Sequence, residues 1–372
     1  MKIDRIDFDG KAVVILGAGA TRGAEFIDPQ SGGQAADERN SKTHPTATRK
    51  CPCVLPPLDG DFFTQAQRLS FHKPSELVTG LIKDVVGQFG TNFELTMEGY
   101  LTRLEQLANV FEDYRFPGRP KPNVYRQMRQ RFLQVLAAVL DESIGRNPQC
   151  SYHKALVGCL SPDDAVMSFN YDWVIDYALK THGQGKWDPR QGYGVHVYAS
   201  GAKARGTQYW SCEENLAAGY TPSLKLLKMH GSMNWFEIPS EKREKEDARL
   251  RLRKRWWHQY GNLKFEIAAP EWNKPTGDGI YRRIWREARK ALKEARALVV
   301  IGYSLPYTDL PAHALLMVDS DDAAPLEILA VVNPDQSSRK RIRQALLGRI
   351  GKQTRVLSFG HFREFAHFIG GQ

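Results

Sequence analysis

Five short motifs hold the residues of this sequence that could do chemistry, and each follows directly on a run of apolar residues. They are Gly17-Ala18-Gly19-Ala20-Thr21, Asn170-Tyr171-Asp172, His230-Gly231-Ser232, Gly302-Tyr303-Ser304 and Asn333-Pro334. A Gly-x-Gly turn leaves backbone amides open to a pyrophosphate. An asparagine amide can hold a ribose hydroxyl or a water, and a histidine can exchange protons near neutral pH. Together these types indicate a site for a nucleotide-like ligand.

Each motif also has a structural interpretation. The dehydrogenase fingerprint needs a third glycine three residues after Gly19, whereas the next glycine, Gly23, falls four residues after it. The fingerprint is therefore not matched, and a tight turn is an alternative. Asp172 precedes an apparent helix and could be its N-cap. Asn170 could serve a structural turn, and a single histidine such as His230 is more often structural than catalytic.

The Gly302 motif differs from the nucleophile elbow of serine hydrolases. That elbow reads Gly-x-Ser-x-Gly, whereas Pro306 stands here at the fifth position. Gly302 and Ser304 therefore predict a second turn that contacts phosphate or ribose, and Asn333 offers an amide to a nucleoside.

The apolar runs before these motifs predict the strands of a parallel sheet, because strands buried on both faces are almost continuously apolar. The clearest are 12–16, 165–169, 224–229, 297–301 and 326–332, and weaker candidates are 264–268 and 355–359. In doubly wound sheets, ligands bind beyond the carboxyl ends of the strands, where all the motifs lie. We expect an α/β, Rossmann-like, doubly wound parallel sheet of about six strands.

Helical spacing of apolar residues predicts an insertion after the first strand. Met97, Leu101, Leu104, Ala108 and Phe111 lie on one helix face, and Met128 to Leu140 repeat in the same way. We predict a helical insertion over 64–150, with 1–63 and 151–372 forming the Rossmann-like domain. Residues 280–295 predict a further helix. The stretch 21–57 is interpreted as a long loop, either a lid over the site or disordered.

Composition limits the class of protein. The 372 residues contain 42% hydrophobic and 25% charged residues, which is typical of a globular chain. Five cysteines form no even disulfide framework. Cys51 and Cys53 are an isolated pair, and the cysteines at 150, 159 and 212 show no paired spacing, so we expect no metal and a cytoplasmic location. No apolar run is long enough to span a membrane.

The chain is basic, with a formal net charge of +10. This excess is compatible with nucleic acid or with a basic rim around a phosphate-bearing ligand. The run 241–255, which Trp256-Trp257 follows, is interpreted as a solvated, charged helix face, with nucleic-acid contact as the alternative. The run 339–343 is likewise interpreted as a charged helix face.

Taken in order, the motifs resemble the sirtuin-like domain family, in particular its bacterial defence-associated branch. The likeness spans about residues 11–335, and the segments 56–63 (Pro-Pro-Leu-Asp-Gly-Asp-Phe-Phe), 269–274 (Ala-Pro-Glu-Trp-Asn-Lys) and Leu305-Pro306 with Asp309 add to it. The resemblance implies a site for nicotinamide adenine dinucleotide (NAD). It implies that Gly17, Ala18, Gly19 and Ala20 wrap the diphosphate, with Gly302 and Ser304 on the same side. Thr21 and Asp172 belong to the same implied site. Asn333 would contact the adenosine ribose, Asn170 the nicotinamide ribose, and His230 would be the general base.

One departure from the family bears on the reaction. Sirtuin deacetylases carry a four-cysteine zinc module after the His-Gly motif, whereas residues 231–301 contain no cysteine. Water is then the expected acceptor, and the expected reaction is hydrolysis of NAD to nicotinamide and ADP-ribose. The resemblance further implies an effector of antiphage, abortive-infection defence. Its activity would be gated by homo-oligomerisation or by a partner such as a HerA-type ATPase or a short Argonaute.

Two other functions stay open at this stage. One is a catalytically silent module that binds NAD or ADP-ribose and signals through a partner. The other is a nucleic-acid-binding effector driven by the +10 charge. In the leading hypothesis nucleic acid would act only indirectly, and no membrane is involved.

Overall fold

The computed structural model describes most of the chain. It describes residues 10–24, 54–91, 94–111, 122–145, 148–197, 223–236, 249–252, 265–268, 279–317 and 323–370. Most of the predicted 21–57 loop, the cysteines at 51, 53 and 212, the Trp256-Trp257 pair and the segment 269–274 lie outside these ranges.

The predicted α/β fold with a six-stranded parallel sheet is confirmed. The strands are β1 (Lys11–Leu16), β2 (Ala165–Ser168), β4 (Lys225–Lys228), β8 (Ala295–Ile301), β9 (Leu326–Val332) and β10 (Ile350–Phe359). Their order in the sheet is β10-β9-β8-β1-β2-β4, with every neighbouring pair parallel. All the clear strand predictions lie in this sheet, as does the weaker one at 355–359.

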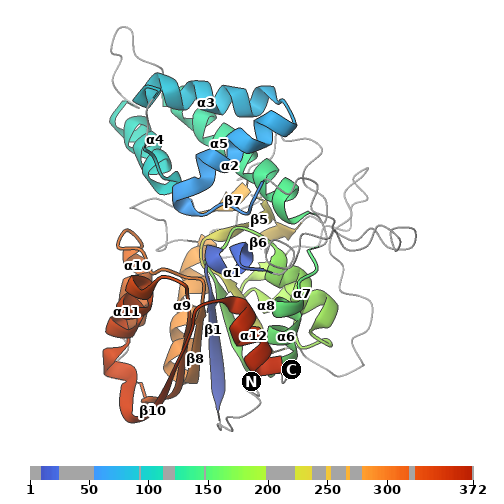
Figure 1. The fold of residues 1–372 in the computed structure, drawn as a ribbon, viewed down its shortest axis with the longest axis vertical. Coiled ribbons are helices and arrows are strands. Elements are labelled where there is room, and N and C mark those ends of the chain that lie inside the picture. Colours follow the sequence, from blue (N-terminus) through green and yellow to red (C-terminus); the bar gives the residue numbers. More distant parts are fainter. Residues whose placement is uncertain are drawn as a thin grey trace, which may run out of the picture.

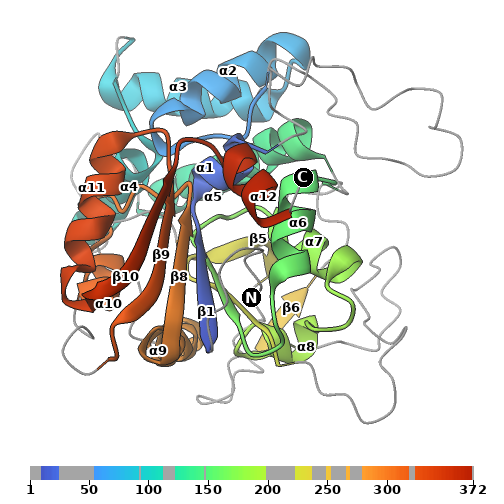
Figure 2. The same cartoon turned by 60° about the horizontal axis from the view of Figure 1, so that its bottom comes forward.

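The sheet is wound in two directions from its centre. From β1 the chain moves to β2 and β4 on one side, and it then returns to β8, β9 and β10 on the other. Helices α6 (Ser151–Cys159), α7 (Val174–His182) and α12 (Phe362–Gly370) pack together on one face. Helices α9 (Gly279–Glu294), α10 (Leu310–Met317) and α11 (Gln336–Ala345) lie on the other (Figures 1 and 2). The strand order therefore reverses between β1 and β8, where ligands bind in this class of fold.

A helical layer follows the first strand, as predicted. It consists of the short 3₁₀ helix η4 (Asp59–Asp61) and helices α2 (Phe62–His72), α3 (Glu76–Phe89), α4 (Met97–Phe111) and α5 (Pro122–Ile144). The layer lies over the end of the sheet that carries α1 (Ala18–Arg22) (Figure 1). Its core of Phe62, Tyr100 and Phe132 continues into Trp173 and Met233, beyond the ends of β2 and β4. The insertion thus covers the carboxyl edge of the sheet. The domain boundaries at residues 64 and 150 stay a prediction.

A second sheet was not predicted. Its strands are β3 (His196–Val197), β5 (Gly231–Phe236), β6 (Arg249–Leu252) and β7 (Phe265–Ile267), in the order β3-β6-β5-β7. The predicted strand at 264–268 belongs here and not to the main sheet. The interpretation of 241–255 as a helix face is wrong at 249–252, because this stretch pairs antiparallel with β5. Its alternating Arg-Leu-Arg-Leu sequence has the period of a strand. The short helix α8 (Pro189–Gly192) precedes β3.

Within the described part of the chain, no helix combines the length and the apolar character that crossing a membrane requires.

His153 on α6 predicts acid sensitivity of the fold. Its Nδ1 lies 3.2 Å from the Sγ of Cys150, its ring packs edge-on against Phe362, and burial lowers its pKa to about 3. The unfolded chain therefore takes up a proton below about pH 6.5, whereas the folded protein does not until about pH 3. The contribution of His153 to the free energy of unfolding is thus complete above pH 6.5 and is lost as the pH falls toward 3. We expect His153 to account for about 2 kcal/mol of the loss between pH 7 and pH 5.

Urea unfolding at the two pH values measures this contribution. His153→Gln should reduce the pH-dependent loss by about that amount, while His361→Gln, at an exposed position, should leave it unchanged. An equal loss in wild type and His153→Gln would contradict the assignment.

Candidate functional site

Two turns meet where the strand order reverses. The amide of Gly17 donates to the carbonyl of Ile301 (3.0 Å), and the amide of Gly19 donates to the carbonyl of Gly302 (2.9 Å). A Cβ on Gly17 would lie 2.4 Å from the Cα of Tyr303. Gly302 has φ +62°, and a Cβ there would lie 2.1 Å from the amide nitrogen of Ala20. The glycines at 17, 19 and 302 are therefore required for contact between the two turns.

This contact bears on the expected diphosphate-binding turn. The amide of Ala20 also has a protein partner, the carbonyl of Gly17 (2.9 Å). The amides of Gly17, Gly19 and Ala20 are thus used inside the protein, and the contact of this turn, including Ala18, with a diphosphate stays a prediction.

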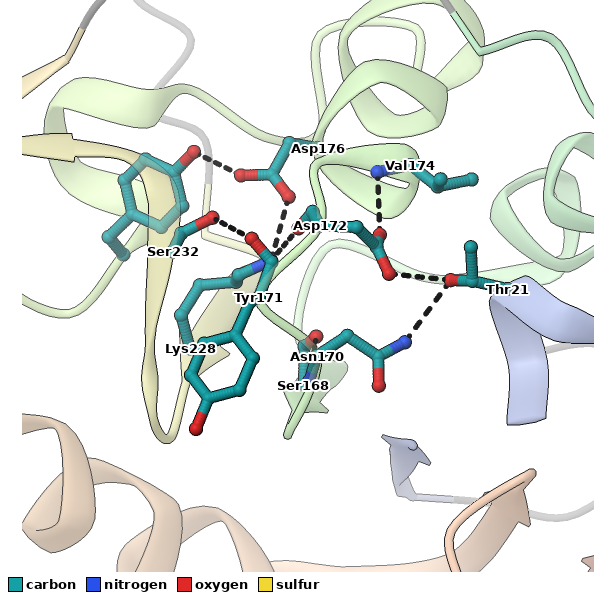
Figure 3. A network of polar contacts seen from close by, with 10 residues as sticks. Thr21, Ser168, Asn170, Tyr171, Asp172, Val174, Asp176, Lys228 and Ser232 are labelled. Atoms are coloured by element: carbon teal, nitrogen blue, oxygen red, sulfur yellow. Dashed lines mark hydrogen bonds and ion pairs between the residues drawn. The ribbon is translucent and has the colours of Figure 1, made fainter. Parts of the chain in front are cut away.

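Thr21 links the glycine turn to the next strand. It lies on α1, a helix of five residues in place of the loop expected to begin here, and its side chain is buried. Its hydroxyl donates to Oδ2 of Asp172 (2.7 Å) and accepts a hydrogen bond from Nδ2 of Asn170 (3.3 Å) (Figure 3). Three of the predicted site residues are therefore in direct contact.

Asp172 lies one residue before Trp173, the N-cap residue of α7, and its side chain binds both α7 and α1, while its contact with a ligand stays a prediction. Its Oδ1 accepts a hydrogen bond from the amide of Val174, the first residue of α7, at 2.9 Å. Its Oδ2 binds Thr21. Burial raises the pKa of this carboxyl, against the opposing effects of Lys228 and of the hydrogen bond from Thr21. The side chain thus connects the first turn of α7 to α1.

Asn170 has an unused acceptor. Its side chain is 6% exposed, its backbone amide donates to the Ser168 hydroxyl, and its Nδ2 is held by Thr21. Its Oδ1 is buried and has no hydrogen-bond partner among the described residues. In Figure 3 this oxygen points away from Thr21. A buried acceptor without a partner costs about 1–3 kcal/mol, which a bound ligand or water can recover.

A buried charged pair lies beneath this segment. Nζ of Lys228 donates to the backbone carbonyl of Asp172 and lies 3.2 Å from Oδ2 of Asp176. Both charged side chains are fully buried, and the hydroxyl of Tyr193 donates to the other oxygen of Asp176. Burial and the nearby Asp176 raise the pKa of Tyr193 well above its usual value, so the phenol stays a donor.

His230 lies beside Asn170 at the end of the neighbouring strand. Ser168 and Lys228 are paired across β2 and β4, and Asn170 and His230 each follow two residues later. The ring of Phe169 contacts His230 edge-on, with centroids 5.1 Å apart, and stacks on Tyr303 at 4.2 Å. His230 Nε2 lies 3.3 Å from Oδ2 of Asp309, which also accepts a hydrogen bond from the Tyr303 hydroxyl (2.7 Å).

Asn333 and Ser304 are placed differently from the central group. Nδ2 of Asn333 donates to the carbonyl of Tyr303 (3.2 Å), and its Oδ1 accepts from the amide of Asp335 (2.9 Å). The side chain joins two strand-end turns, and its contact with a ribose stays a prediction. Ser304 is exposed, and its carbonyl accepts hydrogen bonds from Arg341.

The basic run 339–343 lies on a helix, α11, but is not simply a solvated face. Arg339 donates to the carbonyl of Asn333, and Arg341 donates to the carbonyls of Ser304 and Leu305. The arginines hold the turns beyond β9 and β8. Hydrogen bonds from Ser337 and Ser338 lower the pKa of Asp335, whose carboxylate caps α11.

Several residues of this site were not assigned a role from the sequence. They are Glu98, Asp176, Lys228, Tyr303 and Asp309. The sequence could have indicated Lys228 and Asp176, because each is a charged residue on a face that is otherwise apolar. Glu98 comes from α4 and accepts a hydrogen bond from the hydroxyl of Thr308 (2.5 Å), a contact across 210 positions that no local pattern predicts.

No protein-family model matches this chain, and no curated protein matches it significantly. The assignment of a function therefore depends on the residues themselves. Among the described residues, no group of three or more His, Cys, Asp or Glu side chains could hold a metal ion.

The contact between the two turns predicts a large effect of Gly302→Ala. Positive φ and the clash with Ala20 should destabilise the protein by at least about 2 kcal/mol. The matched control is Gly87→Ala in α3, where a Cβ meets nothing within 4 Å, and this change should be neutral or stabilising. Denaturant unfolding of both variants measures the difference, and similar stabilities would show that the turn contact is not required.

Proposed function

We propose that this protein hydrolyses NAD to nicotinamide and ADP-ribose. The observation that carries the proposal is Asn170. Its amide is buried and fixed by Thr21 beside the β1–β8 switch point, and its oxygen is left without a protein partner among the described residues. His230 lies at the end of the adjacent strand. A fixed amide and an imidazole at this edge suit a ribose and its attacking water.

The reaction needs few protein groups beyond these two. Nicotinamide leaves as a neutral base from a cationic ring, and positive charge builds on the ribose as the N-glycosidic bond breaks. The site needs to orient the ribose and a water and to accept one proton. Asn170 would orient the ribose hydroxyls or the water, and His230 would be the general base, which is worth about 100- to 10,000-fold in rate.

An unregulated activity of this kind would exhaust the NAD of the host cell. We therefore propose a gated effector of antiphage, abortive-infection defence, controlled by homo-oligomerisation or by a partner such as a HerA-type ATPase. The helical layer over the carboxyl edge of the sheet supports gating, because it covers the end where Asn170 and His230 lie.

Nicotinamide release by the purified full chain, alone and with the product of its neighbouring gene, tests the proposal. Asn170→Ala and His230→Ala should each lose about 100-fold or more of the activity while remaining folded. Gln353→Ala removes an exposed side-chain amide on β10 and should retain full activity.

Two results would count against hydrolysis. NAD binding without turnover in every assembly would favour a silent NAD- or ADP-ribose-binding module. Full activity in both Ala variants would place the reaction elsewhere in the molecule.

One observation favours a second function, the binding of nucleic acid. Helix α9 carries six cations and two carboxylates, and α11 carries four cations and no carboxylate. These two helices on one face of the sheet thus hold +8 of the net +10. Phosphate backbones bind such faces with an affinity that falls steeply with salt.

Fluorescence anisotropy with labelled duplex DNA and RNA tests this second function. Arg282→Glu with Arg286→Glu on the exposed side of α9 should abolish a salt-dependent affinity, and Lys352→Glu on β10 is the control. No binding at low salt would exclude the function.

A further inference from the structure

We propose that Asp309 is a positioning residue for His230, which holds the imidazole with its proton on Nε2 so that Nδ1 accepts the proton of the attacking group. The inference deepens the proposed NAD hydrolysis and rests on it. Its structural basis is the 3.3 Å contact between His230 Nε2 and Asp309 Oδ2.

The backbone fixes Asp309 in place. Its amide donates to the carbonyl of Pro306 (3.0 Å), and its carbonyl accepts from the amide of His313 (3.1 Å) in the first turn of α10. The side chain is 1% exposed. In the same turn, Leu305 has φ +48° and its carbonyl is held by Arg341. A carboxylate on such a turn has little freedom to move away from the imidazole.

Tyr303 orients the same carboxylate oxygen. Its hydroxyl donates to Asp309 Oδ2 at 2.7 Å, and its ring is stacked on Phe169 at 4.2 Å and 15°. Burial, followed by the charge of Asp309, raises the pKa of Tyr303 well above its usual value, so the phenol remains a donor. Oδ2 therefore accepts from the phenol and lies 3.3 Å from the imidazole Nε2, and Phe169 packs against both rings.

This arrangement is similar to the carboxylate–histidine pair of hydrolases, in which the carboxylate orients the base. A carboxylate that accepts from one ring nitrogen selects the tautomer, orients the ring and stabilises the imidazolium that forms. Here Nδ1 would take a proton from water as its oxygen bonds to the ribose carbon and nicotinamide leaves with the electrons of the broken bond. The imidazolium then gives this proton to solvent.

Several titratable groups surround His230. Asp309 is in contact, Tyr303 binds Asp309, and the ring of Tyr171 lies 6.2 Å from the imidazole between centroids. Glu98 from α4 binds Thr308, the residue before Asp309, and its charge also acts on Tyr303. Because Asp309 is the acid in contact with the ring, its removal should have the largest effect on the imidazole.

The decisive experiment is ¹⁵N NMR of the histidine side chains in the full chain across pH, with the His230 signals assigned from a His230→Gln sample. We expect the Nε2–H tautomer in wild type. Asp309→Asn should lose this preference and lower the apparent pKa of His230 by about 1 or more. Tyr303→Phe removes a hydrogen bond from the carboxylate and should shift this pKa in the opposite direction. The control is Asp163→Asn, at an exposed position.

Kinetics give the second readout. In Asp309→Asn we expect kcat for nicotinamide release to fall about 100-fold or more with little change in KM, and the acidic limb of the pH profile to move with the NMR titration. Unchanged tautomer and titration in Asp309→Asn would overturn the positioning role. If Asp309→Asn does not fold, Tyr303→Phe replaces it as the test: an unchanged titration of His230 in Tyr303→Phe would also overturn the positioning role. A normal tautomer effect with no nicotinamide release from any assembly would instead contradict the proposed hydrolysis.

Discussion

The buried ammonium of Lys228 is the interaction on which the geometry of the site depends most. It is the last residue of β4, it binds the carbonyl of Asp172, and it pairs with Asp176 where neither side chain is exposed. Breaking such a pair by removing one partner costs about 3–5 kcal/mol, because the other charge is left buried. Lys228 precedes His230 by two residues, and the carbonyl it holds follows Asn170 by two residues. One ammonium therefore fixes the spacing between the segments that present the two proposed catalytic side chains.

The glycine turn shows how a nucleotide-like motif can have a structural cause. Side chains at Gly17 and Gly19 would collide with Gly302 and Tyr303, and the amides of both glycines donate to carbonyls at the end of β8. This contact brings together the ends of β1 and β8, the strands between which the sheet reverses. Thr21 on the short α1 links this contact to Asp172. A ligand here would meet side chains from β2 and β4 as well as the backbone of this turn.

The sequence predicted those parts of the fold that depend on local periodicity. Runs such as Val13–Leu16 and Ile328–Val332 are apolar on both faces and became central strands, and the spacing of Leu101 and Leu104 identified α4. The second sheet was missed although Ser232 to Trp235 in β5 and Arg249 to Leu252 in β6 both alternate polar and apolar residues, because the first stretch follows directly on the His230 motif and the second lies in the charged run 241–255. Asn170 and His230 were predicted from their places at strand ends. Asp309 and Glu98 depend on contacts between segments far apart in the chain, which leave no local pattern.

The helical layer is connected to the site through both polar and apolar side chains. Arg22 on α1 donates to Asp61 and to the carbonyl of Pro56, and Glu98 on α4 accepts from Thr308. Thr308 precedes Asp309, and the core of the layer extends to Trp173 and Met233, which flank the Asn170 and His230 segments. A shift of α4 must therefore either break the hydrogen bond between Glu98 and Thr308 or move the turn that carries Asp309. Because packed cores have discrete arrangements and do not deform continuously, such a shift would change the contact between Asp309 and His230 as a step. The insertion is thus linked to the imidazole through Glu98, Thr308 and Asp309.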